Sequence, residues 1–214
     1  VWLWTFGASV YDEQGKSALN SEKAVQALTW FNSLMQKGYI QQAMARGDAR
    51  TLFKEGRVAF YDDALMSKGA ITNPAFGDIS EYAFPQVHPV LKQGDKPQAS
   101  GWGHLLVIID RSPKKAQAKA FIEHLISEEV ALRYFKENGM LPSKKSVLAN
   151  EAVASDYWSN AWTPVLDGGR LAETAGPLYA AANQVILEEL QAMLSGSKTP
   201  SQAGSAMASR IDTL

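Results

Sequence analysis

Residues 99–110 have the sequence "ASGWGHLLVIID". Trp102 lies between Gly101 and Gly103, and a run of leucine, valine and isoleucine follows at once. A short apolar run that is rich in β-branched residues and bounded by turn residues predicts a buried β-strand. Glycine allows backbone conformations and close approaches that other residues rarely adopt. The stretch therefore predicts a turn that presents a tryptophan at the start of a strand over 104–110.

Helices and short strands alternate around this stretch, which predicts an α/β protein with more helix than strand. Helical spacing of apolar residues and capping residues predict the helices. These are 20–38 (capped by Asn20 or Ser21), 48–56, 63–71, a pair beginning at Ser112 and Ser127, 155–166, and two C-terminal helices beginning near Gly176 and at Thr199. Further strands are expected over 57–62 and 81–86. Apolar stripes place four aromatic residues in the core: Trp30, Phe31, Phe53 and Phe121.

Composition sets bounds on function. The 214 residues are enough for one large domain or two small ones, and 46% apolar with 20% charged residues is ordinary for a globular protein. A net charge of −1 gives no basic excess, so no nucleic-acid partner is expected. No apolar run approaches the roughly 20 residues that span a bilayer. The sequence has no cysteine, which excludes disulfides and thiolate metal sites.

Catalytic and metal-binding motifs are absent from the sequence. His88, His104 and His124 have no spacing that would build a metal site, and no phosphate loop, nucleophile elbow or zinc-protease motif occurs. Asp62 and Asp63 are adjacent, so on a strand they would point to opposite faces and form a poor acid–base pair. For Asp63, capping of the next helix and contact with a ligand both stay open. We expect no metal or cofactor, although a calcium site built from distant oxygen ligands stays open.

The aromatic residues point to a ligand. Trp102 lies outside every apolar stripe, unlike the aromatic residues assigned to the core. In α/β proteins, ligands collect at strand ends and in clefts between domains. An indole face suits the apolar face of a sugar ring, while aspartate, asparagine and backbone groups can bond the hydroxyls. The sequence therefore predicts a carbohydrate site near Trp102.

Four segments carry a resemblance to a known family through their order and spacing. They are "GASVYDEQGKSALNSEKAVQALTWF" (7–31), "LFKEGRVAFY" (52–61), "SGWGHLLVIIDRSPKKAQAKAFIEHLISEEVALRYFKENGMLPSKKSVL" (100–148) and "LEELQAMLSGSKTPSQAGSAMASRI" (187–211). Together they resemble the C-terminal two-thirds of the extracellular solute-binding proteins of ABC transporters. The chain resembles, throughout its length, the branch that binds sugars and oligosaccharides. This branch includes maltose-binding protein.

The resemblance implies a periplasmic-binding-protein-like fold, with two lobes joined by a hinge. Residues 1–86 and 147–214 would form the second lobe. Residues 87–146 would belong to the first lobe, and the rest of that lobe would come from an N-terminal segment missing from this chain. The implied function is capture of a sugar between the lobes, without catalysis, and delivery to an ABC permease in the membrane. The implied location is periplasmic or extracellular, with a lipid anchor in Gram-positive bacteria.

The expected ligand contacts combine the residue patterns with this resemblance. The loop after "VAFY" often carries glycine and tryptophan in the family, and here it has acids that could accept hydrogen bonds from hydroxyls. The candidate site residues are Trp102, Gly101, Asp63, Asp62, Trp4, Tyr179 and Glu173. Two alternatives stay open. One is a carbohydrate-active enzyme that uses paired carboxylates such as Asp62 or Glu173. The other is the same fold binding a polyol, a phosphorylated glycerol or a peptide.

Overall fold

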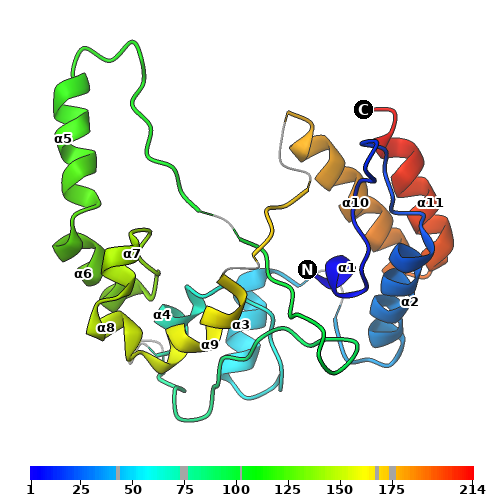
Figure 1. Ribbon diagram of the computed structural model, residues 1–214. Coiled ribbons are helices and arrows are strands. Elements are labelled where there is room, and N and C mark those ends of the chain that lie inside the picture. The colour runs from blue at the N-terminus through cyan, green and yellow to red at the C-terminus, as the bar shows by residue number, and fades with distance from the viewer. Residues whose placement is uncertain (42–43, 73–76, 102, 167–168, 174–176) are drawn as a thin grey trace. The chain divides into compact units, whose positions relative to one another are not determined.

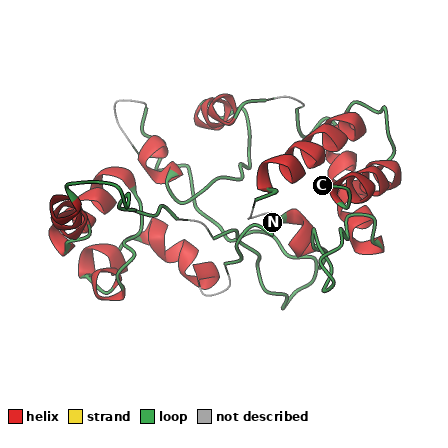
Figure 2. Cartoon of the chain, turned by 90° about the horizontal axis from the view of Figure 1, so that it is seen from above, coloured by secondary structure: helices red, strands yellow, loops and turns green. Residues whose placement is uncertain are grey.

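The computed structural model describes residues 1–41, 44–72, 77–101, 103–166, 169–173 and 177–214 (Figure 1). Two compact units divide the chain: one is Val1–Ala45, His88–Gly101 and Gly168–Leu214, and the other is Arg46–Val87 and Trp102–Asp167. Within the described ranges, regular structure consists of helices and two isolated β-bridges (Figure 2). These units do not follow the predicted lobe boundaries, and the lobe assignment stays a prediction.

The first unit is built on three helices. After the short α1 (Trp2–Thr5), α2 (Glu22–Gln36), α10 (Tyr179–Leu194) and α11 (Pro200–Ile211) pack together (Figure 1). Their shared core contains Val10, Leu19, Leu28, Ala182, Val185, Met193, Ala203, Met207 and Ile211. A Cβ added at Gly204 would lie 2.6 Å from the backbone oxygen of Leu19, so only glycine lets α11 approach that loop this closely.

Local capping signals fix both ends of α2 and the start of α11 as predicted. The Ser21 side chain accepts a hydrogen bond from the backbone of Ala24, and Gly38 follows α2 with φ of 72°. Thr199 and Gln202 form a capping box at the start of α11. An ion-pair cluster connects α11 and the turn before it to α10. Glu189 on α10 is 4% exposed, and its carboxylate binds both Lys198 and Arg210. Burial raises the pKa of Glu189, but the bonds from these two cations outweigh it and lower that pKa overall.

The second unit consists of shorter helices. They are α3 (Arg46–Lys54), α4 (Ser67–Ile71), α5 (Lys115–Leu125), α6 (Glu128–Asn138), α7 (Lys145–Leu148), α8 (Glu151–Ala154) and α9 (Tyr157–Leu166). Ser127 caps α6 and Gly139 ends it with φ of 70°, both as predicted. One core cluster of this unit contains Ile71, Ala83 and Trp158, with Phe53, Leu65, Ile79 and Trp162 partly buried against it.

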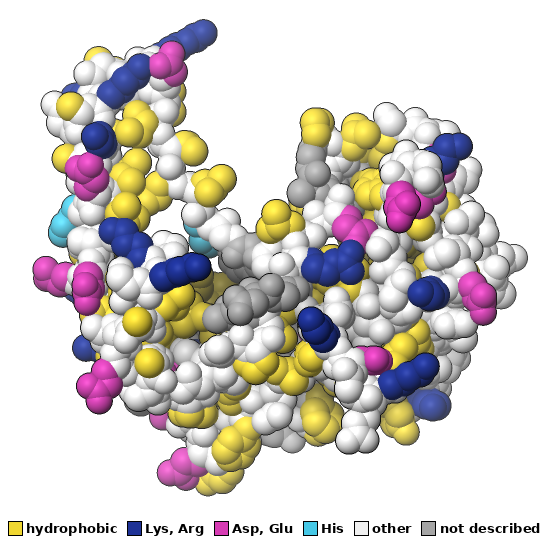
Figure 3. All heavy atoms as spheres, viewed as in Figure 1, with side chains coloured by type: hydrophobic (Ala, Val, Ile, Leu, Met, Phe, Trp, Pro, Cys, Tyr) yellow, Lys and Arg dark blue, Asp and Glu magenta, His cyan; other side chains and the backbone are white. Residues whose placement is uncertain are grey.

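None of the three predicted strands forms in the described residues. Residues 57–62, 81–86 and 104–110 are described, and none of them forms a strand. In the last segment Leu105 is 88% exposed and Ile109 is 73% exposed. Figure 3 shows hydrophobic side chains on the surface over α5 and the chain that precedes it. A strand needs a neighbour to pair its backbone N–H and C=O groups, and the described chain supplies none here.

Two further expectations in this region are corrected. Ser112 does not cap α5: the helix begins at Lys115, and the Ser112 hydroxyl accepts from the backbone N–H of Lys114 at 3.2 Å instead. Phe121 is 60% exposed and therefore is not a core residue. The exposure of Phe121 has a physical cause, since α5 packs on α6 but its other apolar side chains are left uncovered. Trp30, Phe31 and Phe53 are partly buried.

Candidate functional site

Two predicted site residues that are far apart in the sequence are in direct contact. Trp4 on α1 is 9% exposed, and its Nε1 donates a hydrogen bond of 2.5 Å to Oε1 of Glu173. The other carboxylate oxygen of Glu173 accepts from the backbone N–H of Val10. Glu173 thus fastens α1 and the loop that follows it to the segment before α10, so Trp4 and Glu173 belong to one cluster.

Arg170 joins the same cluster and brings Gly101 to it. Its Nη2 donates to Oε1 of Glu173 at 2.9 Å, and its guanidinium carbon lies 4.7 Å from the centroid of the Trp4 ring, a cation–π contact. The backbone N–H of Arg170 donates to Ala99 at 3.0 Å, and Gly101 donates to the carbonyl oxygen of Arg170 at 2.8 Å. This is a parallel β-bridge between Ser100 and Arg170.

Sequence reasoning missed Arg170. One signal was available in the sequence. Arg170 follows two glycines and lies three residues before Glu173, a spacing at which opposite charges can pair. The stacking on Trp4 joins residues more than a hundred positions apart, and no local pattern indicates such a contact.

The glycines beside Trp102 do not have the role expected of them. Neither Gly101 nor Gly103 has a positive φ. A Cβ on Gly101 would lie 3.7 Å from the nearest heavy atom, an ordinary contact, and one on Gly103 would meet no described atom within 4 Å. Backbone strain therefore does not explain these two glycines. Trp102 itself lies outside the described residues, so its ligand contact stays a prediction.

The acidic pair lies in the second unit and is held by arginines. The Asp63 side chain is 4% exposed and accepts hydrogen bonds from Arg46, Arg50 and the backbone of Ala64. Burial raises the pKa of Asp63, but the bonds from Arg50 and Arg46 lower it overall to about 2. Asp63 does not cap the next helix, because the N-cap of α4 is Met66. The neighbouring Asp62 is exposed.

The structure thus brings together Trp4, Gly101 and Glu173 but does not join them to the other predicted residues. Tyr179 is the first residue of α10 and is 48% exposed. Asp62 and Asp63 belong to the other unit. For Tyr179, Asp62 and Asp63, ligand contact stays a prediction.

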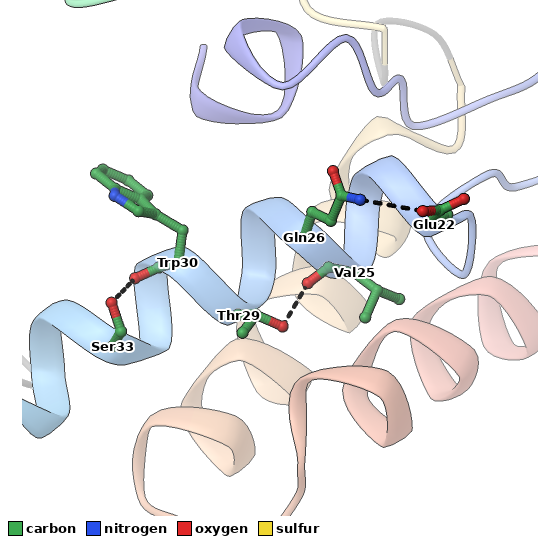
Figure 4. Close-up of a pocket in the computed structure, with 6 residues that line it drawn as sticks. All are labelled: Glu22, Val25, Gln26, Thr29, Trp30 and Ser33. Carbon is green, nitrogen blue, oxygen red and sulfur yellow. Dashed lines mark hydrogen bonds between the residues drawn. The ribbon is translucent and has the colours of Figure 1, made fainter. Parts of the chain in front are cut away.

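A hollow of about 500 Å³ lies along α2 and shares no lining residue with this cluster (Figure 4). It is lined by Glu22, Val25, Gln26, Thr29, Trp30 and Ser33. Its polar side chains bond one another or their own helix: Gln26 donates to Glu22, Thr29 to the carbonyl of Val25 and Ser33 to that of Trp30. Ligand sites combine an apolar wall with converging polar groups, which this single helix face does not offer.

Among the described residues, no group of three or more histidine, cysteine, aspartate or glutamate side chains could hold a metal ion. None of the described helices is both long enough and apolar enough to cross a bilayer.

Comparison with known proteins decides the family. Residues 1–161 match the model of the bacterial extracellular solute-binding protein family. The chain belongs to this family. The resemblance seen in the sequence is confirmed, and the members of the family are binding proteins that act outside the cytoplasm. Binding proteins of Brucella abortus (strain 2308) and Brucella suis biovar 1 are each 24% identical over 178 residues, and each match covers 79% of this chain and 41% of the relative.

Solved structures show the fold of this solute-binding protein. An ABC transporter solute-binding protein from Thermotoga lettingae, bound with α-D-tagatose, has a TM-score of 0.83 and 23% identity, covering 99% of this chain and 54% of that one. The maltose/maltodextrin-binding domain from Bdellovibrio bacteriovorus, bound to maltotriose, has a TM-score of 0.81 and 18% identity, covering 99% and 55%. The chain therefore has a periplasmic-binding-protein type of fold and spans about half the length of these proteins.

Proposed function

We propose that this chain is part of the sugar-capturing protein of an ABC importer, which binds a sugar or oligosaccharide between two lobes and delivers it to a membrane permease. Membership of the extracellular solute-binding family is the observation that carries the proposal. The sugars bound to the Thermotoga and Bdellovibrio proteins, which share its fold, support a carbohydrate ligand. The protein would work in the periplasm or at the outer face of the cell, without catalysing a reaction.

The ligand site would be built around Trp102 and the cluster of Trp4, Gly101 and Glu173. Stacking on an indole and hydrogen bonds to hydroxyls would hold the sugar. Each hydroxyl that is buried without a partner costs about 1–3 kcal/mol, and such penalties set the selectivity. Replacement of Trp102 by alanine should weaken sugar binding by about 1–3 kcal/mol with little change in melting temperature. Unchanged affinity with a large fall in melting temperature would make Trp102 a core residue.

The exposed segment 104–110 would be a strand of the first lobe that pairs with a segment of the same protein outside these 214 residues. Its apolar side chains are uncovered in this chain, and the Thermotoga lettingae protein is almost twice as long. Hydrogen exchange of residues 104–110 tests this pairing. The backbone amides should exchange slowly in the full-length protein and fast in the 214-residue chain. Fast exchange in both would refute the pairing.

A ligand screen of the full-length protein tests the function. Tagatose, maltose and maltotriose represent sugars, and sorbitol, glycerol 3-phosphate and a tripeptide represent the alternative ligands. We expect at least one sugar to raise the melting temperature, because a ligand that binds only the native state stabilises it. Stabilisation by the phosphate or the tripeptide, with no response to any sugar, would refute carbohydrate capture.

The rival function, glycoside hydrolysis, requires two carboxyl groups about 5–10 Å apart across a substrate. In the described chain, Glu173 already accepts from Trp4, Val10 and Arg170, which leaves it poorly suited to donate a proton or attack a sugar. Chromatography of maltotriose incubated with the protein separates the two functions. We expect intact maltotriose after prolonged incubation, and release of maltose or glucose would favour the enzyme.

A further inference from the structure

Arg170 is a half-exposed cation held by well-covered partners. Its side chain is 42% exposed, whereas the Glu173 side chain is 17% exposed and Trp4 is 9% exposed. The guanidinium lies over the Trp4 ring and is bonded at its edge to the Glu173 carboxylate. We propose that Arg170 is a specificity-determining residue that donates hydrogen bonds to the captured sugar, and that Glu173 is its positioning residue. This inference rests on the proposed function.

The first step is orientation. A free arginine side chain samples many rotamers, and binding through it costs the entropy of ordering them. Arg170 is fixed from two directions, by the ring face 4.7 Å away and by the hydrogen bond of 2.9 Å. Its backbone is fixed as well, through hydrogen bonds to Ala99 and Gly101. The guanidinium is therefore held in place before a ligand arrives.

The second step is the supply of donors. A guanidinium has five N–H groups in a planar fork that matches two neighbouring oxygen atoms. Within the described residues, the Arg170 side chain donates one hydrogen bond, to Glu173. Its exposed side can offer paired donors to two adjacent hydroxyl oxygens of a sugar ring.

The third step is charge. Glu173 balances the charge of Arg170, so the pair offers directional donors without a net positive charge. This favours neutral hydroxyl groups over a carboxylate or a phosphate, which would lie close to the Glu173 carboxylate. Glu173 already accepts from Trp4, Val10 and Arg170, so it acts on the sugar through Arg170 rather than by direct contact.

The fourth step is location. The β-bridge at Arg170 pairs it with residues 99–101, immediately before the tryptophan that the sequence indicates as a sugar contact. Trp4, Gly101 and Glu173 were predicted as site residues without reference to Arg170, and each of them contacts it in the structure.

Titration calorimetry of the full-length protein tests the role of Arg170. The probes are tagatose, maltose and maltotriose as neutral sugars, and glucuronate and glycerol 3-phosphate as anions. We expect Arg170→Ala to weaken the binding of a neutral sugar about 10- to 100-fold, and Arg170→Lys, which keeps the charge but loses the fork, at least about 5-fold. The matched control is Arg133→Ala, an exposed arginine on α6 paired with Glu137, which should leave affinity unchanged.

Glu173→Gln separates positioning from simple structural support. Because it removes the balancing charge but keeps an oxygen acceptor, affinity for glucuronate relative to the neutral sugars should rise about 10-fold or more. A merely structural role would lower all affinities together. Wild-type protein that binds none of the sugars overturns the proposed function. Wild-type binding that is unchanged in both Arg170 variants overturns the assignment of Arg170 alone, and an unchanged probe ratio in Glu173→Gln overturns the positioning role.

Discussion

Two regions of the molecule carry many apolar side chains but bury them to different degrees. One is the cluster of α2, α10 and α11, and the other is the segment 104–126. In the three-helix cluster Met193 is 0% exposed and Met207 is 1% exposed. In the other region Leu105 is 88% exposed and Phe121 is 60% exposed. A helix satisfies its own backbone hydrogen bonds and needs only a face to bury, whereas a strand needs a neighbour for every backbone group. The difference separates apolar side chains that the described chain covers from apolar side chains that it leaves exposed.

The largest expected effect comes from matched truncations in the two regions. Met193→Ala should cost about 2–5 kcal/mol of unfolding free energy in the 214-residue chain, because it leaves a cavity between packed helices. Leu105→Ala should cost less than about 0.5 kcal/mol there, since the leucine is exposed. In the full-length protein Leu105→Ala should become strongly destabilising. Urea denaturation measures the unfolding free energy of each variant. Equal costs of the two substitutions in the 214-residue chain would contradict the difference in packing between the two regions.

A smaller effect is expected at the Asp63 clamp in the second unit. Asp63→Asn should cost on the order of 1–3 kcal/mol, because two arginines lose their shared carboxylate. The folded pKa of Asp63 is about 2, below its ordinary value of 3.8. Its stabilising contribution is therefore present above pH 3.8 and is lost as the pH falls through about 2.

Acid titration of stability checks this sign. Wild-type protein should lose more unfolding free energy than Asp63→Asn between pH 4 and pH 2, and the adjacent exposed Asp62→Asn should behave like the wild type. If the unfolding free energies of wild type and Asp63→Asn fall identically with pH, the Asp63 ion pairs do not stabilise the protein.

The smallest expected effect compares two predicted helix caps. Thr199→Ala should destabilise by about 0.5–2 kcal/mol, because Thr199 forms the capping box of α11. Ser112→Ala should change stability by only a few tenths of a kcal/mol, because Ser112 does not cap α5. Thermal denaturation of the two variants measures the difference. A larger cost for Ser112 would show that the helix begins where the sequence predicted.

The sequence predicted the features that depend on local chemistry. Ser21, Ser127, Gly139 and Thr199 lie at helix ends as expected, because caps and glycine terminators act within one turn. The strand over 104–110 could not be confirmed from this chain, because pairing depends on residues distant in sequence.

At the site, Trp4 and Glu173 were predicted and are in contact, while Arg170 was missed. The clamp on Asp63 was missed for the same reason: Arg46 and Arg50 reach it from 17 and 13 residues away, across a loop.

Sugar capture is measured by calorimetric titration of the full-length protein and of the 214-residue chain with tagatose, maltose and maltotriose. We expect saturable binding of at least one of these sugars to the full-length protein, and little or no binding to the chain alone, because part of the site would lie outside it. Binding of none of them by the full-length protein would contradict sugar capture. Equally tight binding by the 214-residue chain would contradict a site that is partly formed by residues outside this chain.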